Sequence, residues 1–150
     1  MVVSLATIRQ DLFSSLQTLL VANKPTYTYN LTTITYTITS AYPQDNPTFP
    51  LIVINKGLIE DQRITMNAAT GEEMIEVQLD FYAKELHGTK AIDAGQDGAM
   101  NTIIGNISVF ISTDGLIPME NFWTDSGIVP FQDKNQILNN STSIMRFKLQ

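Results

Sequence analysis

The stretch EEMIEVQLDFYAK, residues 72–84, decides the fold. From Ile75 to Ala83 every second residue is apolar, whereas the intervening residues, from Glu72 to Lys84, are mostly polar. Successive side chains of a β-strand point to opposite faces of a sheet, so this alternation predicts a strand with one buried and one polar face. The protein is therefore expected to contain a sheet that is covered on one side.

The chain before this strand predicts a helix and a Thr-rich strand. Apolar residues recur at three- and four-residue steps from Ser4 to Asn23, which is typical of an amphipathic helix. Ser4 is the expected N-cap, and Pro25 ends the helix. Thr26–Thr39 is rich in Thr and Tyr, which favours a strand. Its apolar residues change from odd-numbered to even-numbered positions part-way along the segment. We favour a bulge near Thr32–Thr33 as the cause over a short turn that would make two strands.

A proline-containing loop over Ser40–Pro50 leads into a compact apolar run, Leu51–Ile54. Because this run has no alternation, it predicts a central strand that is covered on both faces. The segment Lys56–Gly71 is interpreted as a long arm with a turn at its tip.

After the deciding stretch, His87 and Gly88 form a turn into a second helix, predicted over Thr89–Phe110 with Thr89 as its cap. Three glycines weaken this helix by about 1 kcal/mol each relative to alanine and are expected to allow close packing. They are Gly95, Gly98 and Gly105. The apolar residues of Ser112–Asn140 recur with no sustained period, so this segment is predicted to be a long apolar loop. A last strand, Ser143–Gln150, follows it.

These elements predict an α+β fold in the order α-β-β-β-α-β, within a single domain over residues 1–150. We expect a mostly antiparallel sheet of about four strands, with two helices packed on one face. The chain has no cysteine, which excludes a disulfide scaffold. Only 16% of its residues are charged, well below the usual value of about 25%, which indicates that partners cover part of the surface.

The single histidine offers the best candidate for metal chemistry. His87 lies near Glu85, Asp93 and Asp97 in the sequence, and these residues could hold the divalent ion of a small metal-dependent hydrolase. A catalytic zinc site needs three protein ligands, often two of them histidines, so we prefer a solvated turn followed by an acidic helix start. The sequence predicts no catalytic, cofactor-binding or metal-binding residue, and hence a protein that is not an enzyme.

Four carboxylates gather around the deciding strand: Glu72, Glu73, Glu76 and Asp80. Glu76 and Asp80 share the polar parity and would lie about 13 Å apart along a strand, which is too far for a catalytic acid–base pair. No phosphate loop, nucleophile elbow or dinucleotide fingerprint occurs. A solvated sheet face is therefore the preferred interpretation of these acids.

Negative charge is concentrated in the middle of the chain. The net charge is −6, and residues 60–125 alone carry −9. This distribution disfavours tight DNA binding, which needs basic residues where phosphates lie, although an acidic surface would let DNA pass without sticking. Improved solubility explains the same charge equally well. No signal peptide or apolar run long enough to span a bilayer is present, so we expect a cytoplasm-like compartment and no membrane contact.

The predicted loop contains a group of large apolar residues that could anchor a protein interface: Phe122, Trp123, Ile128 and Phe131. For Trp123 alone, a loop folded back over its own core is the alternative and is favoured slightly.

Taken together, the order of these elements resembles the tail-terminator (tail-completion) proteins of long-tailed bacteriophages and the related neck proteins. The resemblance includes the opening helix Leu5–Leu20, the entry Phe49–Ile54 into an apolar strand, the strand Met74–Tyr82, the helix Thr89–Phe110 and a closing strand. It covers most of the chain and contains no diagnostic motif.

The resemblance implies a structural virion protein that forms a hexameric ring on the last ring of the tail tube. Such a ring stops tube polymerisation and docks to the head, and is assembled in the host cytoplasm. Its expected partners are further copies of the chain, the tail tube protein and a head-completion or neck protein, with no cofactor. The arm Lys56–Gly71 and the loop around Trp123 would contact neighbours, while Glu72, Glu73, Glu76 and Asp80 would face a channel through which DNA passes. A head-completion or neck connector is the alternative within this class.

Overall fold

The central strand of the main sheet is β8, at the C-terminal end of the described chain. The computed structural model describes residues 5–40, 48–55, 74–106, 116–133 and 136–149. Within them the main sheet has six strands in the order β3-β4-β5-β8-β6, and β7 also pairs with β8. Their bounds are β3 Thr37–Thr39, β4 Leu51–Asn55, β5 Met74–Lys84, β6 Leu116–Asp125, β7 Val129–Asp133 and β8 Gln136–Leu149.

Neighbouring strands are antiparallel except β3 and β4, which run parallel. β5 pairs with β8 from Met74 opposite Lys148 to Lys84 opposite Leu138. β6 and β7 pair in succession with different parts of β8, along the edge that β5 leaves free. The fold is thus α+β with a mostly antiparallel sheet, as predicted, but the prediction of about four strands is wrong.

The predicted loop over Ser112–Asn140 is also wrong, because its described part contains β6, β7 and the start of β8. The pairing of β6 with β8 shifts register between Pro118 and Trp123. β7 is short and contains Pro130. A register shift and a proline break the two-residue period, so these strands gave no alternating signal.

The Thr-rich segment forms a hairpin rather than one bulged strand. β1 (Thr26–Tyr29) and β2 (Thr32–Thr35) make a separate antiparallel pair, joined by Asn30 and Leu31. Both turn residues have positive φ, 49° and 63°. Two-residue turns with this backbone normally contain glycine or asparagine, so Leu31 concealed the turn in the sequence. The predicted bulge at Thr32–Thr33 is therefore wrong, and the alternative of a short turn is right.

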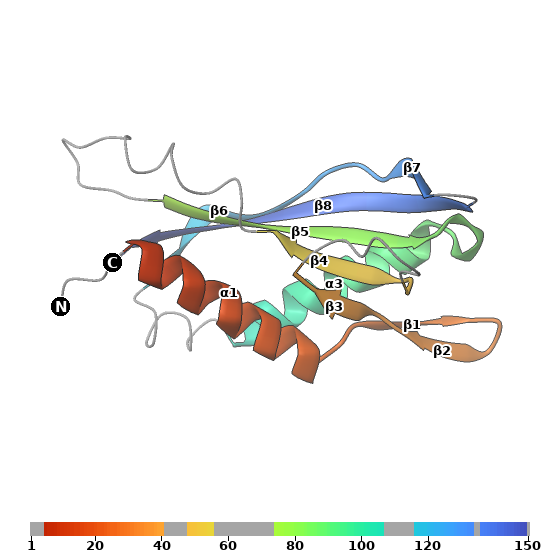
Figure 1. Ribbon diagram of the computed structural model, residues 1–150, viewed down its shortest axis with the longest axis horizontal. Coiled ribbons are helices and arrows are strands. Elements are labelled where there is room, and N and C mark those ends of the chain that lie inside the picture. The colour runs from red at the N-terminus through yellow and green to blue at the C-terminus, as the bar shows by residue number, and fades with distance from the viewer. Residues whose placement is uncertain (1–4, 41–47, 56–73, 107–115, 134–135, 150) are drawn as a thin grey trace.

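Two helices cover one face of the sheet (Figure 1): α1 (Leu5–Ala22) and α3 (Thr89–Gly105). A short 3-10 helix, η1 (Glu85–His87), connects β5 to α3. Gly88, with φ 78°, is the N-cap of α3, so the prediction that Thr89 caps the helix is wrong. The described helix ends at Gly105. The Ser4 cap, the helix end at Phe110 and the arm Lys56–Gly71 lie outside the described residues.

The core lies between this helical layer and the sheet. It includes Leu12, Leu16 and Leu20 of α1, Ile92, Ala99 and Ile103 of α3, and Leu79, Phe81, Met145 and Phe147 of the sheet. Leu51–Ile54 are all buried in β4, an interior strand between β3 and β5, which confirms the prediction of a strand covered on both faces.

Gly95 and Gly98 allow α3 to pack closely, as predicted. A Cβ atom at Gly95 would lie 2.5 Å from the ring of the buried Tyr36, and one at Gly98 would lie 3.0 Å from Pro25. The Tyr36 hydroxyl donates a hydrogen bond to the carbonyl of Ala91 in the same helix. Gly105 has no such neighbour, so close packing explains two of the three glycines.

Candidate interaction surfaces

We call the face opposite α1 and α3 the open face (Figure 1); it is exposed over β5 and β8, whereas Leu51 and Val53 of β4 are buried on it. On β5, Val77, Leu79 and Phe81 point toward the helices and are buried. The side chains between them point to the open face. With their partners on neighbouring strands, the polar residues of this face include Glu76, Gln78, Asp80, Tyr82, Lys84, Thr124, Asn140, Thr142 and Arg146. All of them are partly or fully exposed, so this face can contact a partner.

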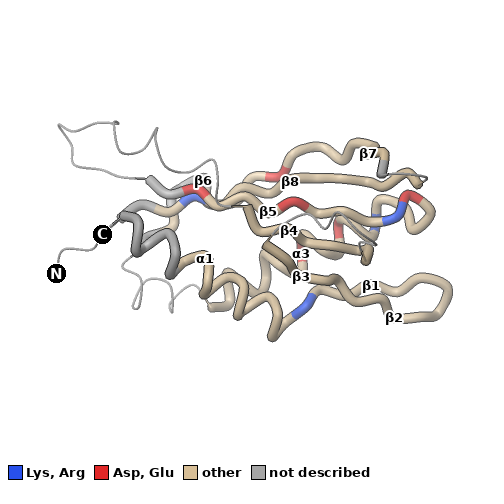
Figure 2. Tube along the Cα trace, viewed as in Figure 1, with Lys and Arg blue, Asp and Glu red and all other residues tan. Residues whose placement is uncertain are grey.

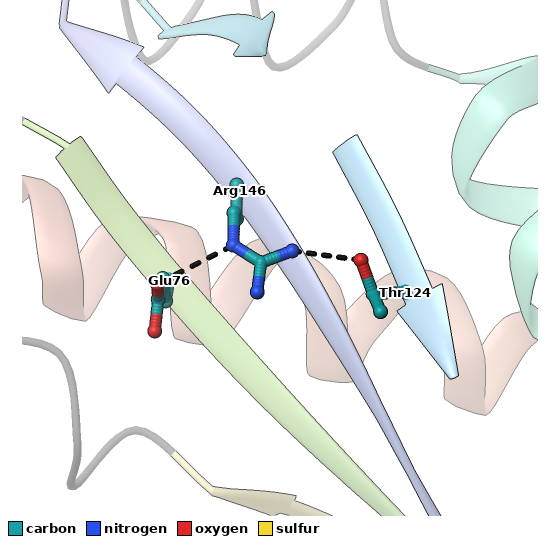
Figure 3. Close-up of polar contacts among 3 residues, drawn as sticks. All are labelled: Glu76, Thr124 and Arg146. Atoms are coloured by element: carbon teal, nitrogen blue, oxygen red, sulfur yellow. Dashed lines mark hydrogen bonds and ion pairs between the residues drawn. The ribbon is translucent and has the colours of Figure 1, made fainter. Parts of the chain in front are cut away.

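Glu76, Arg146 and Thr124 form a chain of polar contacts across three adjacent strands (Figure 3). Glu76 and Arg146 are direct cross-strand partners, and Arg146 Nε lies 3.4 Å from Glu76 Oε1. Arg146 Nη1 donates a hydrogen bond of 2.8 Å to Thr124 Oγ1. The charge of Glu76 is thus balanced locally by a guanidinium group.

Asp80 is held by two neutral donors on the same face. Its Oδ1 accepts a hydrogen bond of 2.7 Å from Thr142 Oγ1 and one of 3.1 Å from Gln78 Nε2. Burial and the neighbouring Asp80 carboxylate raise the pKa of Tyr82. The Asp80 side chain is therefore held in place by hydrogen bonds, close to the Tyr82 hydroxyl.

Of the four acids predicted to face a channel, Glu76 and Asp80 lie on the open face. Glu72 and Glu73 lie outside the described residues. Glu76 lies 3.4 Å from Arg146, and Asp80 accepts a hydrogen bond from Thr142. That these two acids form no catalytic pair stays a prediction.

The four predicted interface residues occupy different environments. Phe122, Trp123 and Ile128 are partly buried and pack against the core. The Phe122 ring meets the edge of Phe147, with centroids 5.0 Å apart, and Trp123 is paired with Met145 on the helical side. The Phe131 ring instead lies edge-to-face with the Tyr82 ring, with centroids 5.2 Å apart, beside the open face. The described structure thus brings Phe122 and Trp123 together and separates Phe131 from them.

A buried polar network, which the sequence did not reveal, links α3 to β8 and to the bend after β6. Gln96 Nε2 donates hydrogen bonds of 2.9 Å to Ser141 Oγ and 3.0 Å to Ser143 Oγ. Ser143 Oγ then donates to Asp125 Oδ1 at 2.6 Å, and this oxygen also accepts from Trp123 Nε1 at 2.7 Å. A usable signal was present, because Ser141 and Ser143 share the parity of the buried Met145.

His87 holds the β1–β2 hairpin against η1. Its Nδ1 lies 2.6 Å from the Tyr27 hydroxyl, and its ring stacks on Tyr29 with centroids 4.2 Å apart. Burial raises the pKa of Tyr27 to about 12, so the phenol stays protonated and can donate to a neutral imidazole. Burial, followed by the charge of Lys84, lowers the pKa of His87, which favours the same neutral form.

The described residues contain no group of three or more His, Cys, Asp or Glu side chains that could hold a metal ion. The metal-dependent alternative required such a group around His87, Asp93 and Asp97. In the described structure the imidazole instead contacts two tyrosines of the hairpin.

Comparisons with known proteins leave the chain without an assigned family. No protein-family model matches it, and no curated protein does either. Among the helices that are described, none is long and apolar enough to cross a membrane.

Proposed function

We propose that the protein is a structural subunit of a phage-like tail, a tail terminator that forms a homohexameric ring at the head-proximal end. The ring stops polymerisation of the tail tube and provides the surface to which the head docks. Its function is geometric and requires no reaction at any side chain. Its partners are further copies of the chain, the tail tube protein and a head-completion or neck protein, and the assembled ring belongs to the virion.

The open face of the sheet carries this proposal. All described helical packing lies on the other face, so a ring can place the open face toward its channel without disturbing the core. Asp80, Gln78 and Thr142 would line that channel with neutral donors and one carboxylate.

This lining suits the passage of DNA without capture. Strong nonspecific binding needs several unpaired basic groups along the phosphate backbone. Basic residues on the described part of the open face include Arg146 and Lys84. Arg146 is 3.4 Å from Glu76 and donates to Thr124, so its charge is partly compensated before DNA arrives.

The proposal is tested by the oligomeric state and by tube length. Native mass spectrometry and negative-stain microscopy should find six-membered rings, alone or with tail tube protein. Added to polymerising tube protein, the rings should cap the tubes and limit their length. A subunit that stays monomeric at high concentration, and also in the presence of tube protein, would contradict the proposal. A ring that binds a head preparation and ignores tubes would identify a neck connector instead.

The orientation of the ring is tested separately with a matched pair of variants. Asp80→Lys places a base on the open face, whereas Asp97→Lys makes the same charge change at an exposed position of α3. The first variant should increase retention of DNA by assembled rings severalfold, and the second should leave it close to wild type. Equal retention in the two variants would show that the open face does not line the channel.

A further inference from the structure

The β1–β2 hairpin is an uncharged projection on an acidic protein. Residues 25–44 contain no Asp, Glu, Lys, Arg or His, although the whole chain has a net charge of −6. Figure 2 shows both strands of the hairpin without a charged residue, whereas charged residues mark β5, β8 and the ends of neighbouring elements. The hairpin also stands outside the main sheet, as a two-stranded pair of its own.

The two faces of the hairpin differ in composition. The register places Tyr27 opposite Ile34, and these two residues are half-buried. The other face consists of four exposed threonines: Thr26, Thr28, Thr33 and Thr35. One face is thus fixed to the protein through Tyr27 and His87, while the threonine face is exposed. Among the strands that are described, β1 and β2 pair only with each other, so each leaves one edge free there.

The tip of the hairpin exposes an apolar side chain. Leu31 is 100% exposed and has a φ of 63°, a backbone region that leucine seldom adopts. Leu86 in η1 is 75% exposed and is adjacent to His87, on which Tyr29 stacks. Figure 1 places the hairpin tip and η1 at the same end of the molecule, away from both termini. Two large apolar side chains therefore face solvent on elements that contact each other.

The β6–β7 edge, one of the two edges of the main sheet, shows what the hairpin lacks. Strand edges that remain free are commonly guarded by proline, charged residues or irregular register. The β6–β7 edge has all three, in Pro118 and Pro130, in Asp125 and in the register shift after Pro118. No such feature occurs between Thr26 and Thr35, so the hairpin is suited to pairing rather than to solvent.

We propose that the β1–β2 hairpin is the segment through which one copy of this chain binds a second copy. Backbone groups of a free strand edge pair with another strand, and the exposed Leu31 is buried at the contact. The inference rests on the proposed function in one respect, that copies of the chain associate, and it is independent of their place in a tail.

The distribution of charge favours a second copy over other occupants. Two copies with the same negative charge repel each other, and a neutral surface is where they approach at least cost. Nucleic acid or an anionic membrane would need basic residues, which the hairpin does not have. A basic protein would be drawn instead to residues 60–125, where the acids are concentrated.

The test measures self-association of purified full-length protein by sedimentation velocity over a range of concentrations. The double variant Leu31→Asp/Thr33→Asp places two negative charges on exposed hairpin positions of an acidic protein and should weaken association at least tenfold. Ile104→Asp is the control, since Ile104 is an apolar residue 48% exposed on α3, and it should associate like the wild type. Circular dichroism and thermal unfolding check that each variant is folded.

A second variant separates loss of contact from loss of folding. Leu31→Gly removes the apolar side chain and suits the positive φ, so it should keep or raise the melting temperature while it weakens association. Wild-type association in both hairpin variants, or a wild-type protein that is monomeric throughout, would overturn the inference. Hairpin-dependent association without any binding to tail tubes would support the inference and contradict the proposed function.

Discussion

The two faces of the sheet are formed by the same strands but have different roles. On the helical face, Leu79 and Phe81 of β5 and Phe147 of β8 are fully buried in one core. At alternate positions of the same strands, Glu76 and Arg146 point to the other face, remain partly exposed and contact each other. Because successive residues alternate between faces, a substitution in β5 can damage either the fold or the interaction surface, depending on its parity. The following predictions test this division, from the largest expected effect to the smallest.

Phe81→Ala should cause the largest loss. The ring is fully buried and lies edge-to-face with Tyr36 at 6.2 Å, so its removal should lower the free energy of unfolding by about 3–5 kcal/mol. Tyr82→Ala, one residue along and on the open face, is the control and should cost clearly less. Urea unfolding monitored by circular dichroism measures both. Equal losses would show that the open face is as tightly packed as the core.

Gly95→Ala should lower the free energy of unfolding by about 1–3 kcal/mol, since the added methyl group would overlap the Tyr36 ring. Gly105→Ala adds the same group to the same helix where no neighbour lies within 4 Å. That variant should be neutral or more stable by up to about 1 kcal/mol. Thermal unfolding compares the pair. If Gly95→Ala were as stable as Gly105→Ala, α3 would pack less closely than described.

Arg146→Gln should have a small effect on stability, because the ion pair with Glu76 lies on a partly exposed surface. A loss of about 0.2–1 kcal/mol is expected, and it should shrink as salt is added. A double-mutant cycle with Glu76→Gln measures the coupling of the two side chains. A coupling well above 1 kcal/mol would mean that the pair is buried by other parts of the protein.

The smallest effect is expected from the titration of His87, which lies on neither face. Its pKa is lowered from 6.5 in the folded protein, so the unfolded chain takes up a proton first as the pH falls. The contribution of His87 to stability is therefore complete above pH 6.5 and is lost as the pH falls through its folded pKa. Melting temperatures at closely spaced pH values should show this slope, and His87→Gln should flatten it. An unchanged slope in that variant would assign the pH dependence to other groups.

The predictable parts of the fold were those with regular patterns. The alternation in β5, the apolar stripe of α1 and the continuous run of β4 each reflect one uninterrupted environment, and all three elements were predicted. The hairpin was missed because Leu31 occupies a turn position where glycine is usual. β6 and β7 were missed because a register shift and two prolines interrupt their pattern.

The candidate site was predictable to a smaller extent. Parity alone placed Glu76 and Asp80 on the polar face of β5, but it could not show that Arg146 compensates one and Thr142 binds the other. Composition identified Phe122 and Trp123 as large apolar residues, yet their packing against the core depends on strands far apart in the sequence. Contacts of this kind arise from the tertiary fold and leave no local signal.

The position of β8 has a consequence for the order in which the protein can fold during synthesis. β5, β6 and β7 all emerge from the ribosome before β8, the partner that the three strands share. Until β8 has been made, β5 can pair with β4 alone, and β6 and β7 lack the strand with which they pair. Exposed strands of this kind are prone to aggregate, so a chain cut before Gln136 should be recovered as insoluble material rather than as a smaller folded protein.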